Sequence, residues 1–375
     1  MNRQAARAIF ASMATLAAMA LAQPAHAAAK DITVDEIPLG VRADGVCNVH
    51  TTDPALDPEH GKDKVLWFIE AGAKRIGRID LVTGEVTRFD MPKVTPVGYT
   101  TDSLDSLPGN DSVHGPCDLI VTKDGTLWFN YQAANAIGTM ETKAPYTIKL
   151  LDIPTPKSLP MAMQLGADGN IYVELTAVDK IARINPVTRQ IDEFALPGTG
   201  NSPIGGTGSA KDGAHWIINM RSNQLVRFDY KTQAMETYAI PTANAQPFVI
   251  RAYDDGLWFT MYGANAIGHF DTVTKTFTEI PVPTPNSAPV GIIMGPDGDL
   301  YSDLGGTDKI ARIDRKTRRI VAEYPLPTKK VWPDEIKQGP DGAIWVPQYF
   351  GGTIARLWLS SFGKDPGYPQ KPKKK

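Results

Sequence analysis

The chain has 375 residues, with 39 Lys and Arg against 41 Asp and Glu, which gives a formal net charge of −2 at pH 7. Nucleic-acid grooves are strongly basic, so this balance excludes a nucleic-acid partner. The length suits two or three average domains or one large repeat domain.

Residues 1–27 have the pattern of a signal peptide. Arg3 and Arg7 precede an apolar run over 8–21, and residues 25–27 (Ala-His-Ala) have the small-x-small form of a cleavage site. A buried N-terminal helix or a membrane anchor is the alternative, but the run is short and Ala-rich for a bilayer span. No later segment reaches transmembrane length. We therefore expect a periplasmic or secreted protein without a membrane span.

A strand of alternating character that ends in proline is predicted at residues 32–38. Similar segments recur at 87–92 and 193–197. They are the last part of a repeated unit, which reads as a proline, a short strand, an Asp-Gly turn, an aromatic strand, a small-residue turn, a strand containing Ile-x-Arg, and this final strand. A repeat of this length and content is the first feature that an assignment of fold must explain.

The aromatic residue of the second strand, which we call the anchor, occurs seven times. After a first interval of 61 residues the spacings are 44, 44, 42, 43 and 44, so about 17 extra residues lie between the first two anchors. Four short strands in each unit are typical of propeller blades, whereas a solenoid would need special capping repeats at both ends. The anchors are Trp67, Trp128, Tyr172, Trp216, Trp258, Tyr301 and Trp345.

The two ends of the repeat region are complementary. The last unit ends near residue 357 without a proline-ending strand, and 32–38 is such a strand without a unit. Pairing them closes the ring and leaves no open sheet edge. The prediction is an all-β, seven-bladed propeller over residues 28–360, followed by a disordered basic tail at 361–375. A closed ring has no edge that demands a partner, so we expect a monomer.

The amino-acid sequence of the repeat is specific to a smaller group of proteins than the propeller architecture is. The segments LWFTMYGANAIG at 257–268 and IPVPTPNSAP at 280–289 closely resemble the virginiamycin B lyase (streptogramin lyase) family, and the resemblance extends over residues 32–358. It implies a seven-bladed propeller. It also implies a lyase that opens a cyclic depsipeptide by magnesium-assisted elimination, without water.

The resemblance also implies positions for the catalytic residues. The catalytic His of the family directly follows the repeat's proline in the last blade, where this chain has Asp334. The two metal-holding acids correspond to Trp332 and Tyr349, and a second His corresponds to Val290. None of the four positions has the implied residue type. An Asp can replace the His as a base when its pKa is raised, but hard cations need oxygen ligands. The fold implied by the resemblance therefore carries over to this chain, whereas the implied site residues do not.

Polar residues gather on the units that flank the first blade. After the repeat's proline stand the pairs 117–118 and 334–335, and the insertion at 95–115 is expected to lie beside the channel mouth as a lid or specificity loop. Carboxylates and a His suit acid–base catalysis or a divalent cation such as Mg²⁺ or Ca²⁺. The alternative is that these acids are simply solvated at the mouth. The expected catalytic residues are Asp334, Glu335 and His114, and the expected metal ligands are Asp118 and Glu70.

The remaining units offer apolar residues, which line most small-molecule sites. The expected substrate-binding residues are Met161, Phe248, Val290, Met261 and Tyr349.

The two cysteines occupy similar places on neighbouring units, with GVCN around Cys47 and GPCD around Cys117. In an oxidising compartment such a pair favours a disulfide, provided that the Cα atoms lie within about 7 Å. A catalytic cysteine is the alternative, but no nucleophile–base arrangement is evident.

Two functions of different classes remain open. The first is an exported lyase- or lactonase-like enzyme that acts on a small ester, lactone or depsipeptide at the channel mouth, with a cation polarising the carbonyl. The second is a non-catalytic periplasmic propeller that binds a peptide, a glycan or a protein. No pattern indicates an organic cofactor.

Overall fold

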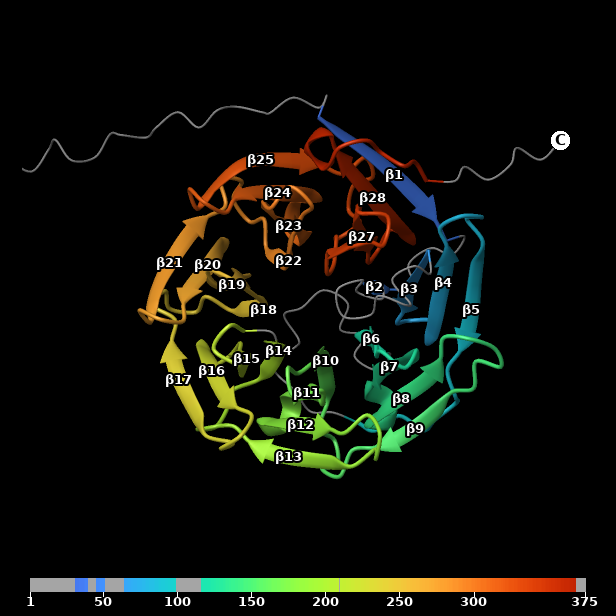
Figure 1. The fold of residues 1–375 in the computed structure, drawn as a ribbon, viewed down its shortest axis with the longest axis vertical. Helices are drawn as coiled ribbons and strands as arrows, with labels where there is room; N and C mark the ends of the chain where they lie inside the picture. The colour runs from blue at the N-terminus through green and yellow to red at the C-terminus, as the bar shows by residue number, and fades with distance from the viewer. Residues whose placement is uncertain (1–30, 40–44, 51–63, 99–115, 209, 369–375) are drawn as a thin grey trace, which may run out of the picture.

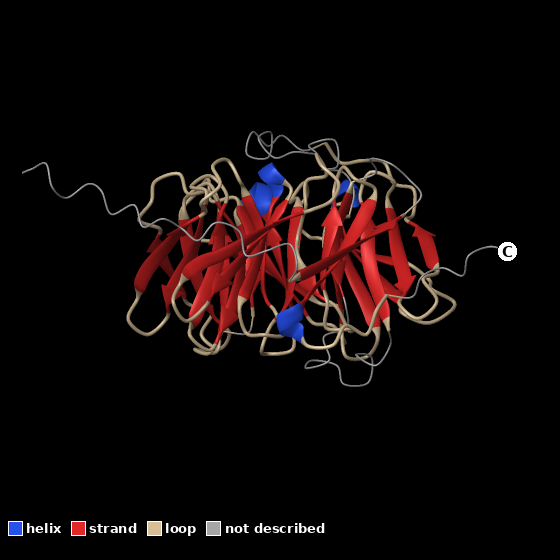
Figure 2. Cartoon of the chain, turned by 90° about the horizontal axis from the view of Figure 1, so that it is seen from above, coloured by secondary structure: helices blue, strands red, loops and turns tan. Residues whose placement is uncertain are grey.

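The computed structural model describes residues 31–39, 45–50, 64–98, 116–208 and 210–368. In this part of the chain, seven antiparallel sheets of four strands each form a ring about a common axis (Figure 1). Seen from the side, the ring is a disc with loops on both faces (Figure 2). The predicted all-β, seven-bladed propeller is confirmed.

In each of the first six blades the strands follow chain order from the axis to the rim. The first blade consists of β2 (Val46–His50), β3 (Val65–Glu70), β4 (Arg75–Asp80) and β5 (Val86–Asp90). The second consists of β6 (Leu119–Val121), β7 (Thr126–Tyr131), β8 (Ala136–Glu141) and β9 (Lys149–Asp152). The third consists of β10 (Pro160–Leu165), β11 (Ile171–Leu175), β12 (Lys180–Ile184) and β13 (Ile191–Ala195).

The other blades repeat this arrangement. The fourth consists of β14 (Pro203–Thr207), β15 (Ala214–Asn219), β16 (Gln224–Asp229) and β17 (Met235–Ala239). The fifth consists of β18 (Pro247–Tyr253), β19 (Gly256–Met261), β20 (Ala266–Asp271) and β21 (Thr276–Pro281). The sixth consists of β22 (Pro289–Met294), β23 (Leu300–Leu304), β24 (Lys309–Asp314) and β25 (Arg319–Pro325). The seventh consists of β26 (Lys337–Gln338), β27 (Ile344–Gln348), β28 (Thr353–Leu359) and β1 (Ile32–Pro38). Short 3-10 helices are η3 (Gln132–Ala134), η4 (Thr176–Val178), η5 (Gly305–Thr307) and η6 (Ser360–Phe362).

The anchors join the turns of the repeat to its core. Trp216 and Trp345 are fully buried, and burying roughly 200 Å² of aromatic surface stabilises the fold by about 5 kcal/mol. The indole Nε1 of Trp216 donates to Asp212 at 3.1 Å, and that of Trp345 donates to Asp341 at 2.9 Å. Both aspartates belong to the Asp-Gly turns, so one residue serves the turn and satisfies the buried indole N–H.

The first strand closes the ring as predicted. β1 pairs antiparallel with β28 from Ile32 to Pro38. The Glu36 carboxylate accepts hydrogen bonds from the Thr328 backbone N–H at 3.1 Å and from its hydroxyl at 2.6 Å. In the preceding blade, Glu323 accepts the same two hydrogen bonds from Thr284. The N-terminal strand thus makes the contact that an ordinary outer strand makes.

The chain continues past the last strand in contact with the seventh blade. Arg356 is fully buried and donates to Asp365 at 2.7 Å, while Trp358 Nε1 donates to the Gly363 carbonyl at 3.1 Å. A buried guanidinium needs such a partner because an unpaired buried charge is strongly destabilising. The prediction of a disordered tail from residue 361 is therefore wrong for 361–368, and the rest of that tail lies outside the described residues.

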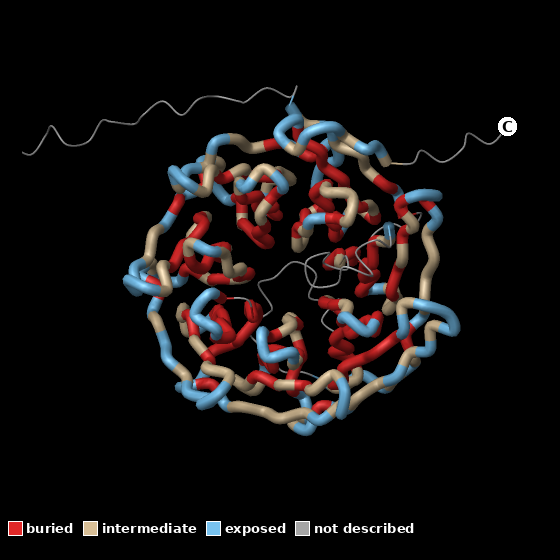
Figure 3. Tube along the Cα trace, in the orientation of Figure 1, coloured by how far each residue is buried: buried red, intermediate tan, exposed pale blue. Residues whose placement is uncertain are grey.

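Burial decreases from the inner strands to the rim (Figure 3). Every residue of β7, β15 and β19 is buried, whereas β17 on the rim contains no buried residue. No helix among the described residues has the length and apolar character needed to cross a bilayer. The predicted signal peptide at 1–27 lies outside the described residues.

Candidate active site

The innermost strands carry a bulge directly after the repeat's proline, and this bulge presents side chains at the channel mouth. In β18, for example, the register shifts between Pro247 and Ile250. A bulge removes a backbone N–H from the ladder, and here Val249 N instead donates to Thr260 Oγ1 at 3.0 Å. Thr260 stands two residues after its anchor and also donates to the next blade, at 2.7 Å from the Val290 carbonyl. The bulge is therefore held from both sides.

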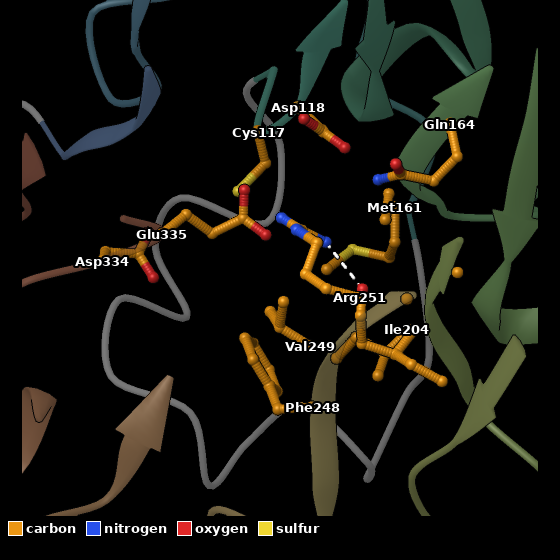
Figure 4. Close-up of a pocket in the computed structure, with 14 residues that line it drawn as sticks. Cys117, Asp118, Met161, Gln164, Ile204, Phe248, Val249, Arg251, Asp334 and Glu335 are labelled. Atoms are coloured by element: carbon orange, nitrogen blue, oxygen red, sulfur yellow. Dashed lines mark hydrogen bonds between the residues drawn. The ribbon is translucent and has the colours of Figure 1, made fainter. Parts of the chain in front are cut away.

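A pocket opens among these bulges, on the side of the ring where the second to fifth blades face the seventh (Figure 4). It encloses about 500 Å³, part of which is open to solvent. Its lining residues are Cys117, Asp118, Met161, Ala162, Gln164, Ile204, Gly205, Gly206, Phe248, Val249, Ile250, Arg251, Asp334 and Glu335. Of the predicted catalytic and metal-binding residues, Asp334, Glu335 and Asp118 thus meet in one place.

Asp118 is a buried carboxyl tied to three blades. It accepts hydrogen bonds from its neighbour Leu119 N at 2.8 Å, from Met163 N of the third blade at 2.6 Å, and from the Asn48 amide of the first blade. Burial, followed by the charge of Glu335, raises the pKa of Asp118 to about 7. A carboxyl of this kind exchanges a proton near neutral pH, although its oxygens are already engaged with N–H donors.

Asp334 and Glu335 stand on the seventh blade, just before the short strand β26. Asp334 is held by its backbone N–H, which donates to Pro347 O at 3.0 Å. Burial, with the charges of Glu335 and Asp303, raises the pKa of Asp334 well above its ordinary value. The Glu335 carboxylate lies 3.5 Å from Lys337 Nζ, and the φ of Glu335 is 57°. A non-glycine residue in this left-handed region is strained and is often found at functional sites.

A further ring of residues pairs in register with the anchors and adds positive charge to the channel. Arg251 pairs with Trp258, and Lys337 pairs with Trp345. Burial, together with Lys337 and Arg251, lowers the pKa of the corresponding His50 to about 3, so its imidazole is neutral. The seven positions are His50, Ile120, Gln164, Thr207, Arg251, Ile293 and Lys337. Arg251 and Lys337 stand at the fourth position after the repeat's proline. The sequence prediction considered only the first two positions, so it did not include these cations.

The apolar wall of the pocket is formed by the third, fourth and fifth blades. Met161 and Phe248, both predicted to bind substrate, line it together with Ile204 and Val249. Met161 is half-buried and is also contacted by the amide of Gln132 at 2.9 Å. These side chains give one half of the pocket an apolar surface, opposite the carboxyls of the seventh blade.

Three other predicted substrate-binding residues do not line this pocket. Met261 is fully buried in a core between the fourth and fifth blades, and Val290 is 2% exposed. Tyr349 is buried near the first blade, where its hydroxyl packs against Gly45. Met261 and Val290 point into the blade interfaces, because alternate residues of a strand face opposite sides of the sheet.

The structure does not bring Glu70 to the pocket. Its buried carboxylate forms ion pairs with Arg75 at 2.8 Å and with Arg88 at 3.0 Å. Two guanidinium partners compensate the buried charge of Glu70. The contacts of Glu70 are therefore ion pairs within the first blade. His114, the third predicted catalytic residue, lies outside the described residues.

The two cysteines are adjacent but free. Both are unpaired thiols, which corrects the predicted disulfide. Cys47 is fully buried, and its Sγ donates to the Pro116 carbonyl at 3.7 Å. The Cys117 side chain, followed by burial, raises the pKa of Cys47 well above its ordinary value. Cys47 is therefore a packed thiol, while Cys117 borders the pocket.

Comparison with known proteins assigns the chain to a family. A model of the virginiamycin B lyase family matches residues 99–304 and 252–363, which together make up more than half of the chain. The chain belongs to the virginiamycin B lyase family. A virginiamycin B lyase from Nocardia farcinica (strain IFM 10152) is 27% identical over 209 residues, or 54% of this chain and 63% of that protein. The match thus spans less than two thirds of that relative.

Solved structures of lyases in this family have the same architecture. A streptogramin B lyase is 26% identical, with a TM-score of 0.74 over 88% of this chain and 98% of its own. The virginiamycin B lyase of Staphylococcus aureus is 27% identical, with a TM-score of 0.73 over 88% of this chain and 100% of its own. A catalytically inactive variant of the latter, with quinupristin, has the same identity, TM-score and coverage.

The resemblance to virginiamycin B lyases implies a divalent cation, and the described residues do not fit one. Asp118 already accepts N–H donors on both oxygens, and Glu335 faces Lys337. Arg251 adds a second positive charge inside the same pocket, which disfavours another cation. Within the described residues, no three His, Cys, Asp or Glu side chains are grouped so as to hold a metal ion.

Proposed function

We propose that this protein is a lyase that opens a small ester, lactone or depsipeptide by elimination at the channel mouth, with Asp334 as the base. The supporting observation is that Asp334 stands directly after the repeat's proline in the last blade, the position at which the family resemblance implies the catalytic His. It lines a pocket together with an apolar wall.

The environment of Asp334 suits proton abstraction from carbon. Burial and the neighbouring carboxyls raise its pKa, and a carboxylate with a raised pKa is a stronger base once it is ionised. Asp303, fully buried behind the bulge of the sixth blade, has a pKa raised to about 7 by its burial. An ionised Asp334 therefore carries its negative charge in poorly solvated surroundings near other acids, which makes it a stronger base.

The step balances without water or an external reagent. The Asp334 carboxylate takes the proton from the carbon next to a carbonyl, and the electron pair of that C–H bond forms a carbon–carbon double bond. The bond from the adjacent carbon to the ester oxygen breaks, and its electron pair leaves with the carboxylate. The products are an alkene and a carboxylate on one opened chain, and Asp334 is left protonated until it returns its proton to solvent.

The pocket supports a partly apolar substrate. Met161, Ile204 and Phe248 provide the apolar surface, and the carboxyls are confined to the second and seventh blades. Such a mixture of apolar walls with a few polar groups is typical of sites for small molecules. A cyclic ester with an apolar side chain beside its scissile bond would place the reacting carbon on the Asp334 side.

A non-catalytic binding propeller is the second candidate, and the four departures from the family's implied residues favour it. Asp334, Trp332, Tyr349 and Val290 replace the implied His and acid residues. The same pocket would then bind a peptide or small-molecule ligand without turnover. We also propose that the protein is exported as a monomer to the periplasm or the medium, on the strength of the sequence pattern at 1–27.

The experiment is a comparison of the purified mature protein with two variants on a panel of cyclic depsipeptides and lactones. We expect Asp334→Asn to lower kcat/KM by about 10²–10⁴-fold, because an amide cannot accept the proton. Asp90→Asn is the matched control, since Asp90 is exposed on the rim strand β5. Saturable binding without turnover would support the binding propeller, and equal turnover by Asp334→Asn would contradict the role given to this residue.

A further inference from the structure

Arg251 is a pocket residue for whose charge the described part of the chain supplies no ion-pair partner. It stands on the innermost strand of the fifth blade, and its side chain extends into the middle of the pocket (Figure 4). Its hydrogen bond is to the Ile250 carbonyl, at 2.8 Å from Nη1. Among the described residues, no carboxylate lies within ion-pair distance of it. The guanidinium carries five N–H donors, of which this hydrogen bond uses one.

Several other partly or fully buried arginines of the propeller are paired with acids. Arg227 contacts Asp212 at 2.7 Å, and Arg312 contacts Asp299 at 2.7 Å. The fully buried Arg356 has three aspartate partners. Half-buried Arg189 and Arg318 instead contact Trp128 and Thr278, so an arginine without an acid partner does not by itself indicate a ligand. The place of Arg251 inside the pocket is what suits its guanidinium to an acidic group supplied by the ligand.

The neighbouring charges leave the pocket positive below neutral pH. Asp118 has a pKa raised to about 7, and the pKa of Asp334 is raised well above its ordinary value. When both are protonated, Glu335 is the one remaining acid of the lining, whereas Arg251 and the nearby Lys337 supply two cations. The pKa of Lys337 is lowered by burial and by the charge of Arg251.

We propose that Arg251, assisted by Lys337, is a carboxylate-binding site that holds the carboxylate end of the ligand in the channel. The assignment of that carboxylate to the leaving group rests on the proposed function. As the proton moves to Asp334, negative charge moves from Asp334 to the ester oxygen, and the guanidinium stabilises the charge where it arrives. Two fixed cations thereby occupy the role that the family resemblance gives to a metal ion, for which the described residues do not fit.

The geometry also defines the chemical class of the ligand. The apolar residues Met161, Ile204 and Phe248 lie on the same side of the pocket as the strand that carries Arg251. A ligand with a carboxylate joined to a short apolar chain satisfies both surfaces at once. A neutral ligand of the same shape would leave the guanidinium without an acceptor, and a cationic ligand would be repelled by it.

The test is a calorimetric titration of the intact protein with three ligands of one shape: hexanoate, hexanamide and hexylamine. We expect hexanoate to bind about tenfold or more tightly than hexanamide, and hexylamine not to bind, because a charge-assisted guanidinium–carboxylate pair is lost in each. Hexanoate should bind more tightly at pH 6 than at pH 8, since Asp118 is protonated at the lower pH.

Two variants locate the site. Arg251→Gln should weaken hexanoate binding by about tenfold or more, and Lys337→Gln should weaken it less. Arg319→Gln is the matched control, because Arg319 is exposed on the rim strand β25. Equal affinity for hexanoate and hexanamide, or unchanged binding by Arg251→Gln, would overturn the proposal. The binding readout is separate from turnover. A protein that binds hexanoate through Arg251 but cleaves no ester would refute the proposed function and leave the carboxylate site intact.

Discussion

The carboxylate of Asp118, on the second blade, accepts the backbone N–H of Met163 on the third blade at 2.6 Å. It also accepts the Asn48 amide of the first blade, so one carboxyl joins the inner ends of three blades at the edge of the pocket. The innermost strand of a blade has no strand to pair with on the axis side. Side-chain hydrogen bonds such as these therefore hold the inner strands of neighbouring blades together at the channel mouth.

Asp118→Asn should therefore destabilise the fold. An amide has a single acceptor oxygen, and its NH₂ would face an N–H donor, so we expect a loss of about 1–3 kcal/mol in the free energy of unfolding at pH 8. Urea titration measures it, with Asp90→Asn as the control on the rim. A variant as stable as the parent would show that Asp118 does not link the blades.

Glu174 and His215 predict a dependence of stability on pH. They face each other between the third and fourth blades with Oε1 and Nε2 3.8 Å apart, and both are fully buried. None of their four side-chain N and O atoms has a hydrogen-bond partner among the described residues. Burial raises the pKa of Glu174 to about 8 and lowers that of His215 to about 3.

The sign follows from which state binds the proton. The raised pKa of Glu174 means that the folded state holds a proton that the unfolded state has lost, so stability falls as pH rises towards 8. The lowered pKa of His215 acts oppositely, and only below about pH 6.5, where the unfolded imidazole is protonated. Between pH 6.5 and 8 we expect the free energy of unfolding to fall by roughly 1–2 kcal/mol.

Glu174→Gln should reduce this slope, while Asp118 and Asp303, whose pKa values are raised to about 7, still contribute to it. Urea titration at pH 6.5 and 8 measures the change. Glu141→Gln, on an exposed position of β8, should keep the slope of the parent. An unchanged slope in Glu174→Gln would mean that Glu174 is ionised in the folded protein.

Ring closure gives a prediction for Glu36. Its carboxylate accepts two hydrogen bonds from Thr328 and one from Gln348 at 2.9 Å. Glu36→Ala should lower the free energy of unfolding by about 1 kcal/mol, because the buried Gln348 amide loses its acceptor, whereas the exposed Thr328 can bond to water. Glu85→Ala, in an exposed turn of the first blade, is the control. Equal stability of the two variants would contradict closure through β1.

Alkylation of the two cysteines distinguishes free thiols from a disulfide. Cys117 is half-buried and borders the pocket, whereas Cys47 is fully buried with a raised pKa. Because the thiolate is the reactive form, an alkylating reagent should label one thiol per native molecule and two after unfolding without reductant. No labelling after unfolding would show that the pair is oxidised.

Much of the fold was predictable because each blade of a propeller has the same turns and the same buried aromatic residue. Each anchor, such as Trp216, needs a core, and its Asp-Gly turn sets the register of the unit, so counting anchors counts blades. The complementary ends at 32–38 and 353–359 then required closure. The packing of residues 361–368 was not predictable, since it depends on the buried Arg356, whose need for a carboxylate has no local sequence signal.

The site was predictable only in part. Asp118, Asp334 and Glu335 were found because the position after the repeat's proline faces the mouth. Glu70 was misplaced because Arg75 and Arg88, on the next two strands, pair with it. Arg251 and Lys337 were missed because only the first two positions after the repeat's proline were considered, whereas both cations stand at the fourth.

The central claim is an elimination, and the mass of the product in oxygen-18-labelled water tests it most directly. We expect a cyclic depsipeptide or lactone to be opened to a product of unchanged mass, which contains a new double bond and no labelled oxygen. A product heavier by one labelled water would show hydrolysis, and would contradict the assignment of Asp334 as a base acting on carbon.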